Sequence, residues 1–160
     1  MVETKNNAVK ANSFLILCCI LFLASCGSID VYEKTKPFPE HEWKGIDSVS
    51  VTFDIKDSAS MYNVYFVLRH EDAYRKKNIW VDIAIKGPDT TVNIKPEFNL
   101  ADNTRWLGTA MDDIIEHRIN LDSRPRLLKK GQYTFTLKQA MREDPLQYVL
   151  NAGIRVEKAK

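Results

Sequence analysis

The three histidines of this 160-residue chain are the side chains that first suggest chemistry, because each one has a carboxylate as a direct neighbour. They are His41, His70 and His117. A histidine near a carboxylate is suited to acid–base catalysis. In a strand, however, adjacent side chains point to opposite faces, and no His-x-His or His-x3-His spacing gathers metal ligands here. We therefore expect solvated charged loops at these positions, with no catalytic role and no metal or other cofactor.

A group of carboxylates at Asp112, Asp113 and Glu116 is the second candidate, because paired carboxylates hydrolyse glycosides and clustered ones bind calcium. The group lacks the alternating oxygen ligands and the glycine of a calcium loop. The chain also contains no serine nucleophile elbow and no glycine-rich phosphate loop. The sequence therefore predicts a protein that is not an enzyme.

Three aromatic residues, Tyr74, Trp80 and Trp106, lie near the ends of predicted strands, where a sandwich can expose rings that stack on sugars. Trp80 alternates with the polar neighbours Asp82 and Lys86, so it forms either a surface platform or part of a second buried layer. We favour burial of Trp80, because most tryptophans are largely buried.

Arg69 stands within a predicted strand and has two possible roles. It either pairs with a carboxylate of this chain and fixes the packing between sheets, or presents its guanidinium to a carboxylate of a partner protein. We favour the structural role. The candidate carboxylates are Asp82, Asp113 and Glu143.

The N-terminal segment ends at a cysteine that fits a lipid-attachment site. Lys5 and Lys10 precede an unbroken apolar run at 14–24, which is too short for a membrane span of about twenty residues but suits a secretory signal. The sequence Leu-Ala-Ser-Cys that follows resembles the lipobox of bacterial lipoproteins. We predict that residues 1–25 are a cleaved signal peptide and that Cys26 is acylated and anchors the protein in a membrane.

Removal of residues 1–25 leaves 21 basic and 20 acidic residues, so the mature chain has a net charge of about +1. This balance predicts neither nucleic-acid binding nor a polybasic membrane patch. Cys18 and Cys19 lie in the removed segment, and Cys26 is the only cysteine that remains. We therefore expect a domain without disulfides, zinc or thiol chemistry, stabilised by its apolar core.

From residue 47 onward, apolar and polar residues alternate with a period of two, which is typical of half-buried strands. The expected strands are 49–55, 61–70, 79–85, 90–94, 133–137 and 152–158. Residues 105–111 and 114–121 are ambiguous between helix and strand, and the surrounding pattern favours strands. Because long amphipathic helices are missing, residues 46–160 are predicted to form one all-β domain, an antiparallel β-sandwich that is either Ig-like or a jelly roll.

Residues 26–45 show no sustained periodicity and contain Pro37 and Pro39, which favour extended backbone. We predict that this segment is an extended tether between the lipid and the domain. The alternative is that Phe38 and Trp43 dock onto the domain and shorten the tether. Docking is expected for Trp43, because an indole left in water forfeits about 2–3 kcal/mol of burial free energy.

Several short, distinctive blocks follow one another along the predicted domain. The first is NVYFVLRH at 63–70 followed by Tyr74 and NIW at 78–80; the second is WLG at 106–108, DI at 113–114 and EHR at 116–118; the third is KGQYTF at 130–135, QAMR at 139–142 and GIRVE at 153–157. In order and spacing, together with the lipobox, these blocks resemble the gliding-motility lipoprotein GldH family. The chain departs from the family pattern at Ala110 and at residues 151–152.

The resemblance implies a lipid-anchored, non-enzymatic envelope protein that interacts with other envelope or motility proteins in gliding and in the associated protein secretion. Gly27 is not the aspartate that retains lipoproteins at the inner membrane, so we expect the outer membrane. The alternative function is a carbohydrate-binding envelope lipoprotein that binds a glycan through Tyr74, Trp80 or Trp106. That alternative requires at least two coplanar, exposed rings on one face.

Overall fold

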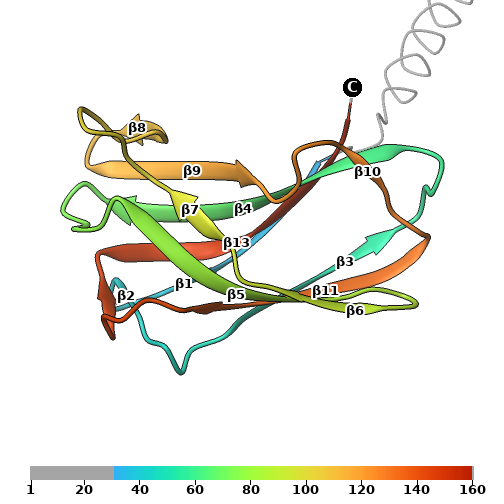
Figure 1. Cartoon of the computed structure of the whole chain (residues 1–160), viewed down its shortest axis with the longest axis horizontal. Coiled ribbons are helices and arrows are strands. Elements are labelled where there is room, and N and C mark those ends of the chain that lie inside the picture. The colour runs from blue at the N-terminus through green and yellow to red at the C-terminus, as the bar shows by residue number, and fades with distance from the viewer. Residues whose placement is uncertain (1–30, 160) are drawn as a thin grey trace, which may run out of the picture.

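The computed structural model describes residues 31–159, which form two main antiparallel β-sheets packed face to face (Figure 1). Residues 42–43 and 146–147 form a third, two-stranded sheet. The strands are β1 (Val31–Pro37), β2 (Glu42–Trp43), β3 (Val49–Ile55), β4 (Met61–Glu71), β5 (Asn78–Lys86), β6 (Thr91–Ile94), β7 (Glu97–Asn99), β8 (Thr109–Met111), β9 (Ile114–Asn120), β10 (Arg126–Leu127), β11 (Gly131–Gln139), β12 (Leu146–Gln147) and β13 (Val149–Lys158). The predicted all-β sandwich is confirmed. The predicted signal peptide and Cys26 lie outside the described residues.

The order of the strands is that of a jelly roll. The first sheet runs β1-β13-β4-β9-β8 with β10 also on β4, and the second runs β3-β11-β5-β6 with β7 also on β5. The main pairs are therefore nested: β1 with β13, β3 with β11, β4 with β9 and β5 with β6. This nesting is the two-Greek-key jelly-roll arrangement, and it decides between the two topologies that the sequence left open.

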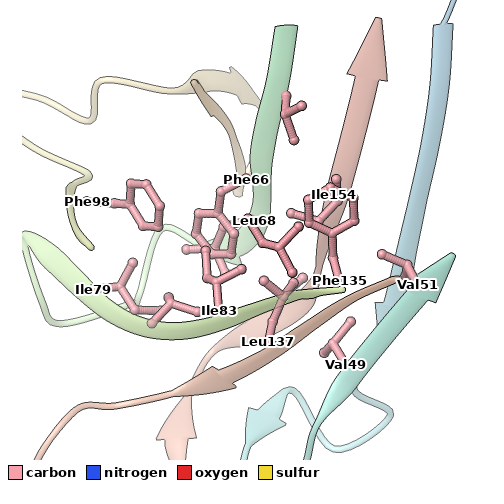
Figure 2. Packing of buried hydrophobic residues seen from close by; sticks show 14 of the residues in the cluster. Val49, Val51, Phe66, Leu68, Ile79, Ile83, Phe98, Phe135, Leu137 and Ile154 are labelled. Atoms are coloured by element: carbon pink, nitrogen blue, oxygen red, sulfur yellow. The ribbon is translucent and has the colours of Figure 1, made fainter. Parts of the chain in front are cut away.

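The core lies between the two sheets and is built from the apolar face of each long strand. Figure 2 shows side chains of β3, β4, β5, β11 and β13 directed into this space, including Val49, Phe66, Ile83, Leu137 and Ile154. Phe66 and Phe98 stack with ring centroids 4.6 Å apart. Since each fully buried side chain of this size contributes about 1.5–3 kcal/mol, the alternation that predicted the strands also supplies the main stabilisation.

The predicted tether over residues 26–45 is wrong for its larger part. Residues 31–37 are strand β1, which pairs with β13 along its whole length, from Val31 opposite Glu157 to Pro37 opposite Asn151. Beyond β1, Phe38 and Trp43 are buried and stack with ring centroids 5.3 Å apart, so the docking alternative is confirmed for both.

Strand β1 was not predicted from the alternation of apolar and polar residues, because the positions that face the second sheet hold lysines. Lys34 donates to the carbonyl oxygen of Thr52 on β3, the edge strand of the other sheet, and Lys36 donates to that of Ser48, directly before β3. The Lys34 ammonium also lies 5.3 Å from the centre of the Phe53 ring. The lysines therefore cap an exposed strand edge, a position where charge prevents edge-to-edge pairing with other chains.

The remaining strand predictions agree with the structure, and residues 109–111 and 114–120 are strands, as favoured. Val67, on the outer face of β4, is fully buried. Four short strands, β2, β7, β10 and β12, have no counterpart in the prediction, because two or three residues carry no detectable period. Among residues 31–159, no helix has the length and apolarity needed to cross a membrane.

Gly153 allows β1 to approach β13, and its replacement tests that contact. A Cβ at this position would lie 2.1 Å from the Lys34 carbonyl oxygen and 2.6 Å from the Thr35 Cα. We expect Gly153→Ala to lower the free energy of unfolding by about 1–3 kcal/mol, as overpacking does, and to increase hydrogen exchange in β1. Urea denaturation and exchange mass spectrometry measure both effects.

The matched control is Gly45→Ala, whose Cβ would meet only side-chain atoms, the nearest being Asp144 Oδ2 at 3.2 Å. This variant should stay close to the original stability. Equal stability of the Gly153→Ala and Gly45→Ala proteins would contradict the proposed role of Gly153.

Candidate functional site

The residues singled out from the sequence do not converge on one site. Arg69 lies on the outer face of the first sheet, and Tyr74 and Trp106 surround the buried His70. Trp80 lies in a separate groove beside the second sheet. The structure therefore offers three arrangements: a buried histidine pair, a network of surface ion pairs and an open groove.

His70 and His117 form a buried pair between β4 and β9. The two Nε2 atoms are 3.0 Å apart, and the side chains are 0% and 2% exposed. The prediction of solvated histidines is therefore wrong for these two. The period-two alternation of the strand could have predicted the burial of His70, because His70 follows Phe66 and Leu68 on the face that points into the core.

The hydrogen bonds assign one proton to each ring of the pair. His70 Nδ1 lies 2.7 Å from the Glu71 carbonyl oxygen, which only accepts, so Nδ1 carries a hydrogen. A neutral His70 then accepts at Nε2, and His117 donates from its Nε2. Burial lowers the pKa of both residues, and the neighbouring His70 further lowers that of His117, to about 4. Both rings are therefore neutral at pH 7.

Aromatic rings close the space around this pair. The Tyr74 and Trp106 rings lie 4.9 and 4.6 Å from the His70 ring, centre to centre. Trp106 Nε1 donates to the Asp72 carboxylate, and burial raises the pKa of Tyr74. Tyr74 is only 4% exposed. The proposed stacking platform at Tyr74 is therefore wrong, and these rings instead hold the segments around residues 72–74 and 106 against the strands.

Arg69 belongs to a network of ion pairs, here named the charge ladder, that crosses four strands of the first sheet. Its members are Glu33 on β1, Arg155 and Glu157 on β13, Arg69 on β4, and Glu116 and Arg118 on β9. Arg69 pairs with carboxylates of this chain, as favoured, but the predicted partners are wrong, and the ion pairs lie within the first sheet and not between the two sheets. Arg69 pairs with Glu33 and Glu116, because the strand register aligns these positions on the outer face.

Glu33 is the centre of the charge ladder. Its carboxylate contacts Arg69 Nη2 at 2.9 Å, Arg118 Nε at 3.3 Å and Arg155 Nη1 at 3.4 Å. At one end, partial burial of Glu157 is outweighed by its hydrogen bonds with Arg155 and Tyr65, and its pKa is lowered. The ladder contains three cations and three anions, so its net charge is zero. The Arg69 guanidinium is already paired with carboxylates of this chain, so it is not free to bind a carboxylate of a partner protein.

Trp80 is the exposed aromatic residue among the three, with 37% of its surface accessible. Its predicted membership of the polar-facing set of β5 is confirmed, whereas the favoured burial is wrong. It lies in a groove of about 810 Å³, named here the Trp80 groove. The groove is lined by Lys76, Asn78, Trp80, Lys95, Ala140, Met141, Arg142 and Glu143.

The Trp80 groove is formed where the segment after β11 continues along β5 and reaches Trp80. Ala140 N donates to the Trp80 carbonyl oxygen at 2.8 Å, and Trp80 N lies 3.2 Å from the Met141 sulfur. Glu143 pairs with Lys76 at 2.7 Å. The result is an apolar indole surface bordered by three cations and one anion, suited to a ligand that has both apolar and acidic groups.

The carboxylates and the remaining histidine do not assemble a site. Glu116 is held by Arg69 and Arg118 in the charge ladder, and Asp112 and Asp113 are exposed in the turn between β8 and β9. His41 Nδ1 bonds to Glu71 on the surface. Among residues 31–159, no three His, Cys, Asp or Glu side chains are placed to hold a metal ion.

Comparison with known proteins identifies the family. The model of the family described as GldH lipoprotein matches residues 30–156. The chain belongs to the GldH lipoprotein family. This membership confirms the resemblance drawn from the sequence blocks, and it makes the protein an envelope-associated lipoprotein of gliding motility.

Two curated members of the family match nearly the whole chain. The gliding motility lipoprotein GldH homolog of Christiangramia forsetii is 25% identical over 91% of this chain and 94% of its own length. The gliding motility lipoprotein GldH of Flavobacterium johnsoniae is 29% identical over 91% of this chain and 96% of its own length. The shared length shows that the family relation covers the whole sandwich.

Solved structures give much weaker matches. Latent PorU from Porphyromonas gingivalis aligns with a TM-score of 0.36 and 10% identity, over 81% of this chain and 13% of PorU. The Bacillus thuringiensis delta-endotoxin Cry8Ea1 aligns with a TM-score of 0.38 and 13% identity, over 80% of this chain and 20% of the toxin. The jelly-roll assignment therefore rests on the strand pairing itself.

The neutral histidine pair predicts a loss of stability in acid. The pKa of His117 is about 4 in the folded protein and about 6.5 when unfolded, so between these values only the unfolded chain binds the proton. The free energy of unfolding should fall by about 3 kcal/mol as the pH drops from 6.5 to 4. Urea titrations across this range measure the slope.

In His117→Gln the amide still donates to His70 but does not titrate, so the slope between pH 4 and 6.5 should become shallower. His70, whose pKa is also lowered by burial, accounts for the slope that remains. An unchanged slope in this variant would show that His117 is not buried in its neutral form.

The charge ladder predicts that the loss of the Glu33 carboxylate destabilises the protein more than the loss of an exposed carboxylate does. Glu33→Gln should lower the free energy of unfolding by about 1–2 kcal/mol, because three arginines lose their shared anion in a partly buried setting. The control is Glu40→Gln, which removes the exposed pair with Lys44 and should leave stability unchanged. Equal effects of the two substitutions, measured by urea denaturation, would refute the special position of Glu33.

Proposed function

We propose that this GldH-family lipoprotein is a non-enzymatic interaction component of the gliding-motility apparatus and the associated protein secretion. Acyl chains on Cys26 hold it in the outer membrane, and the Trp80 groove binds a partner protein of the envelope. Each acyl CH₂ contributes about 0.8 kcal/mol of membrane affinity, so several chains make the anchor effectively permanent.

The observation that carries the proposal is the exposed indole of Trp80 inside a groove. Exposed tryptophans in concave surfaces are typical energetic centres of protein interfaces. Arg142, a second residue type enriched in such centres, lies in the same groove and is exposed. Both come from segments fixed by backbone hydrogen bonds, so the surface is formed before a partner arrives.

A protein partner is favoured over a glycan by the state of the other two rings. The carbohydrate-binding alternative needs two coplanar, exposed rings on one face. Tyr74 is buried, and Trp106 packs against His70 with its indole nitrogen bonded to Asp72. Trp80 is therefore the one exposed ring among the three candidates, and charged side chains border it.

Crosslinking in whole cells, followed by mass spectrometry of co-purified proteins, tests the proposal. Trp80→Ala should lower the yield of a specific envelope partner about thirtyfold, because truncating such a tryptophan costs about 2 kcal/mol or more. The control is Leu107→Ala, which truncates another exposed apolar side chain outside the groove, 52% accessible in the original protein.

Both variants must be present in the membrane at the original level. An unchanged set of partners for Trp80→Ala would contradict the proposed role of the groove. Recovery of polysaccharide fragments that depends on Trp80, without a protein partner, would instead support the carbohydrate-binding alternative.

A further inference from the structure

One end of the sandwich is tied to the proposed lipid anchor by very little chain. Strand β1 begins at Val31, and the five Cα–Cα steps back to Cys26 extend at most about 18 Å. The β1 start therefore cannot move far from the membrane surface. Whatever else lies at this end of the molecule is brought close to the lipid headgroups as well.

The strand register shows which segments share that end. Val31 is opposite Glu157, Lys158 is opposite Tyr62, and Gly131 is opposite Ile55. Figure 1 shows the same end on the right, with the C-terminal end of β13, strand β10 and the turn before β6. We name it the anchor-end surface. It consists of residues 31–32, 56–61, 87–90, 121–130 and 158–159.

Charge is concentrated on the anchor-end surface. It contains six basic residues, Lys56, Arg124, Arg126, Lys129, Lys130 and Lys158, against three acidic ones, Asp57, Asp89 and Asp122. The three acids already pair with Lys158, Lys129 and Arg126. Lys56, Arg124 and Lys130 are exposed and, within residues 31–159, have no carboxylate partner, so they carry the excess of three positive charges.

The opposite end has the reverse balance. Its connecting segments, at 38–48, 72–77, 100–108, 112–113 and 140–148, contain nine acidic and six basic residues. The molecule is therefore polarised along its strands, with the positive end next to the anchor. The near-neutral net charge of the mature chain had predicted no basic membrane patch, because a sum over the sequence does not show where the charges lie.

Exposed apolar side chains accompany these cations. Tyr32 is 45% accessible, and Met61 and Leu127, which are paired in register, are 41% and 62% accessible. Apolar side chains among cations are the composition of surfaces that lie in the interfacial layer of a membrane. Acidic headgroups attract Lys and Arg within about a Debye length, and the short tether keeps these cations near enough to the membrane to enter that range.

We propose that the anchor-end surface docks onto the anionic headgroups of the leaflet that holds the Cys26 acyl chains. Lys56, Arg124 and Lys130 contact the phosphates, and Leu127 and Met61 enter the interfacial layer. This inference rests on the proposed lipidation of Cys26 and adds an orientation to it. The docked domain stands with its strands directed away from the membrane and holds the Trp80 groove at the far end.

The test uses the full lipidated protein reconstituted into vesicles of phosphatidylcholine alone or mixed with phosphatidylglycerol. Leu127→Cys introduces the one free thiol of the mature protein and carries a polarity-sensitive fluorophore. The fluorophore should shift to the blue, and lipids brominated on their chains should quench it, in the phosphatidylglycerol vesicles. Leu107→Cys, an equally apolar exposed position at the far end, should show neither effect.

Charge removal provides the second measurement. Lys56→Gln, Arg124→Gln and Lys130→Gln together should abolish the quenching at Leu127→Cys, as should high salt. Removing three cations from the far end, by Arg75→Gln, Lys77→Gln and Arg105→Gln, should leave it unchanged.

The outcomes separate the two proposals. A lipidated, vesicle-bound protein whose Leu127 fluorophore stays in water overturns the docking while the anchor stands. Fatty-acid incorporation that persists in Cys26→Ala overturns the anchor and with it the geometry of docking. Equal quenching in both kinds of vesicle overturns the role of the anionic headgroups.

Discussion

The pairing of the last strand with the first is the constraint on which the rest of this structure depends. Strand β13 lies between β1 and β4, and it joins the start of the described chain to the middle of the first sheet. The pairing closes the nested set of strands that defines the jelly roll. It also needs Gly153, because the β1 backbone passes where a side chain would otherwise stand. Once β1 is in place, its lysines cap the edge of β3 in the opposite sheet.

The same register organises the charged surface. Residues separated by more than a hundred positions, such as Glu33 and Arg155, meet on the outer face because their strands are adjacent. The charge ladder is therefore a consequence of strand order. Its three cations and three anions cancel, so the ladder adds no net charge to the outer face of the first sheet. Excess positive charge lies at one end of the sandwich and excess negative charge at the other, in connecting segments that strand pairing does not constrain.

The two ends differ in their suitability for binding. At the end near the anchor, basic and apolar residues suit a membrane surface. At the far end, the segment that follows β4 rests on the buried histidine pair through Tyr74, and Lys76 of the same segment lines the Trp80 groove. A neutral, fully buried pair can pack against aromatic rings without a desolvated charge. The interior of the sandwich thus fixes the shape of the groove at its surface.

Much of the fold could be predicted from the sequence, because the alternation of apolar and polar residues in a strand is a local property. The long strands β3, β4, β5, β11 and β13 followed from it directly, as did most of the core. Strand β1 did not, because its inward positions hold Lys34 and Lys36, which look like a polar tether until their β3 partners are known. The Trp80 groove was harder to predict from the sequence. Trp80 was placed on the correct face of its strand, but the segment after β11 that completes the groove contacts Trp80 only in the folded protein.

The sequence by itself determined the all-β class, the predicted lipid-attachment cysteine and the family, since each depends on residues close together in the chain or on blocks in fixed order. Only the tertiary structure decided the jelly-roll topology, the partners of Arg69, the contact between His70 and His117, and the separation of charge between the two ends. The physical reason is the same for all four. Each depends on which distant segments become neighbours, and strand order in a sandwich is selected by how the whole chain closes its core.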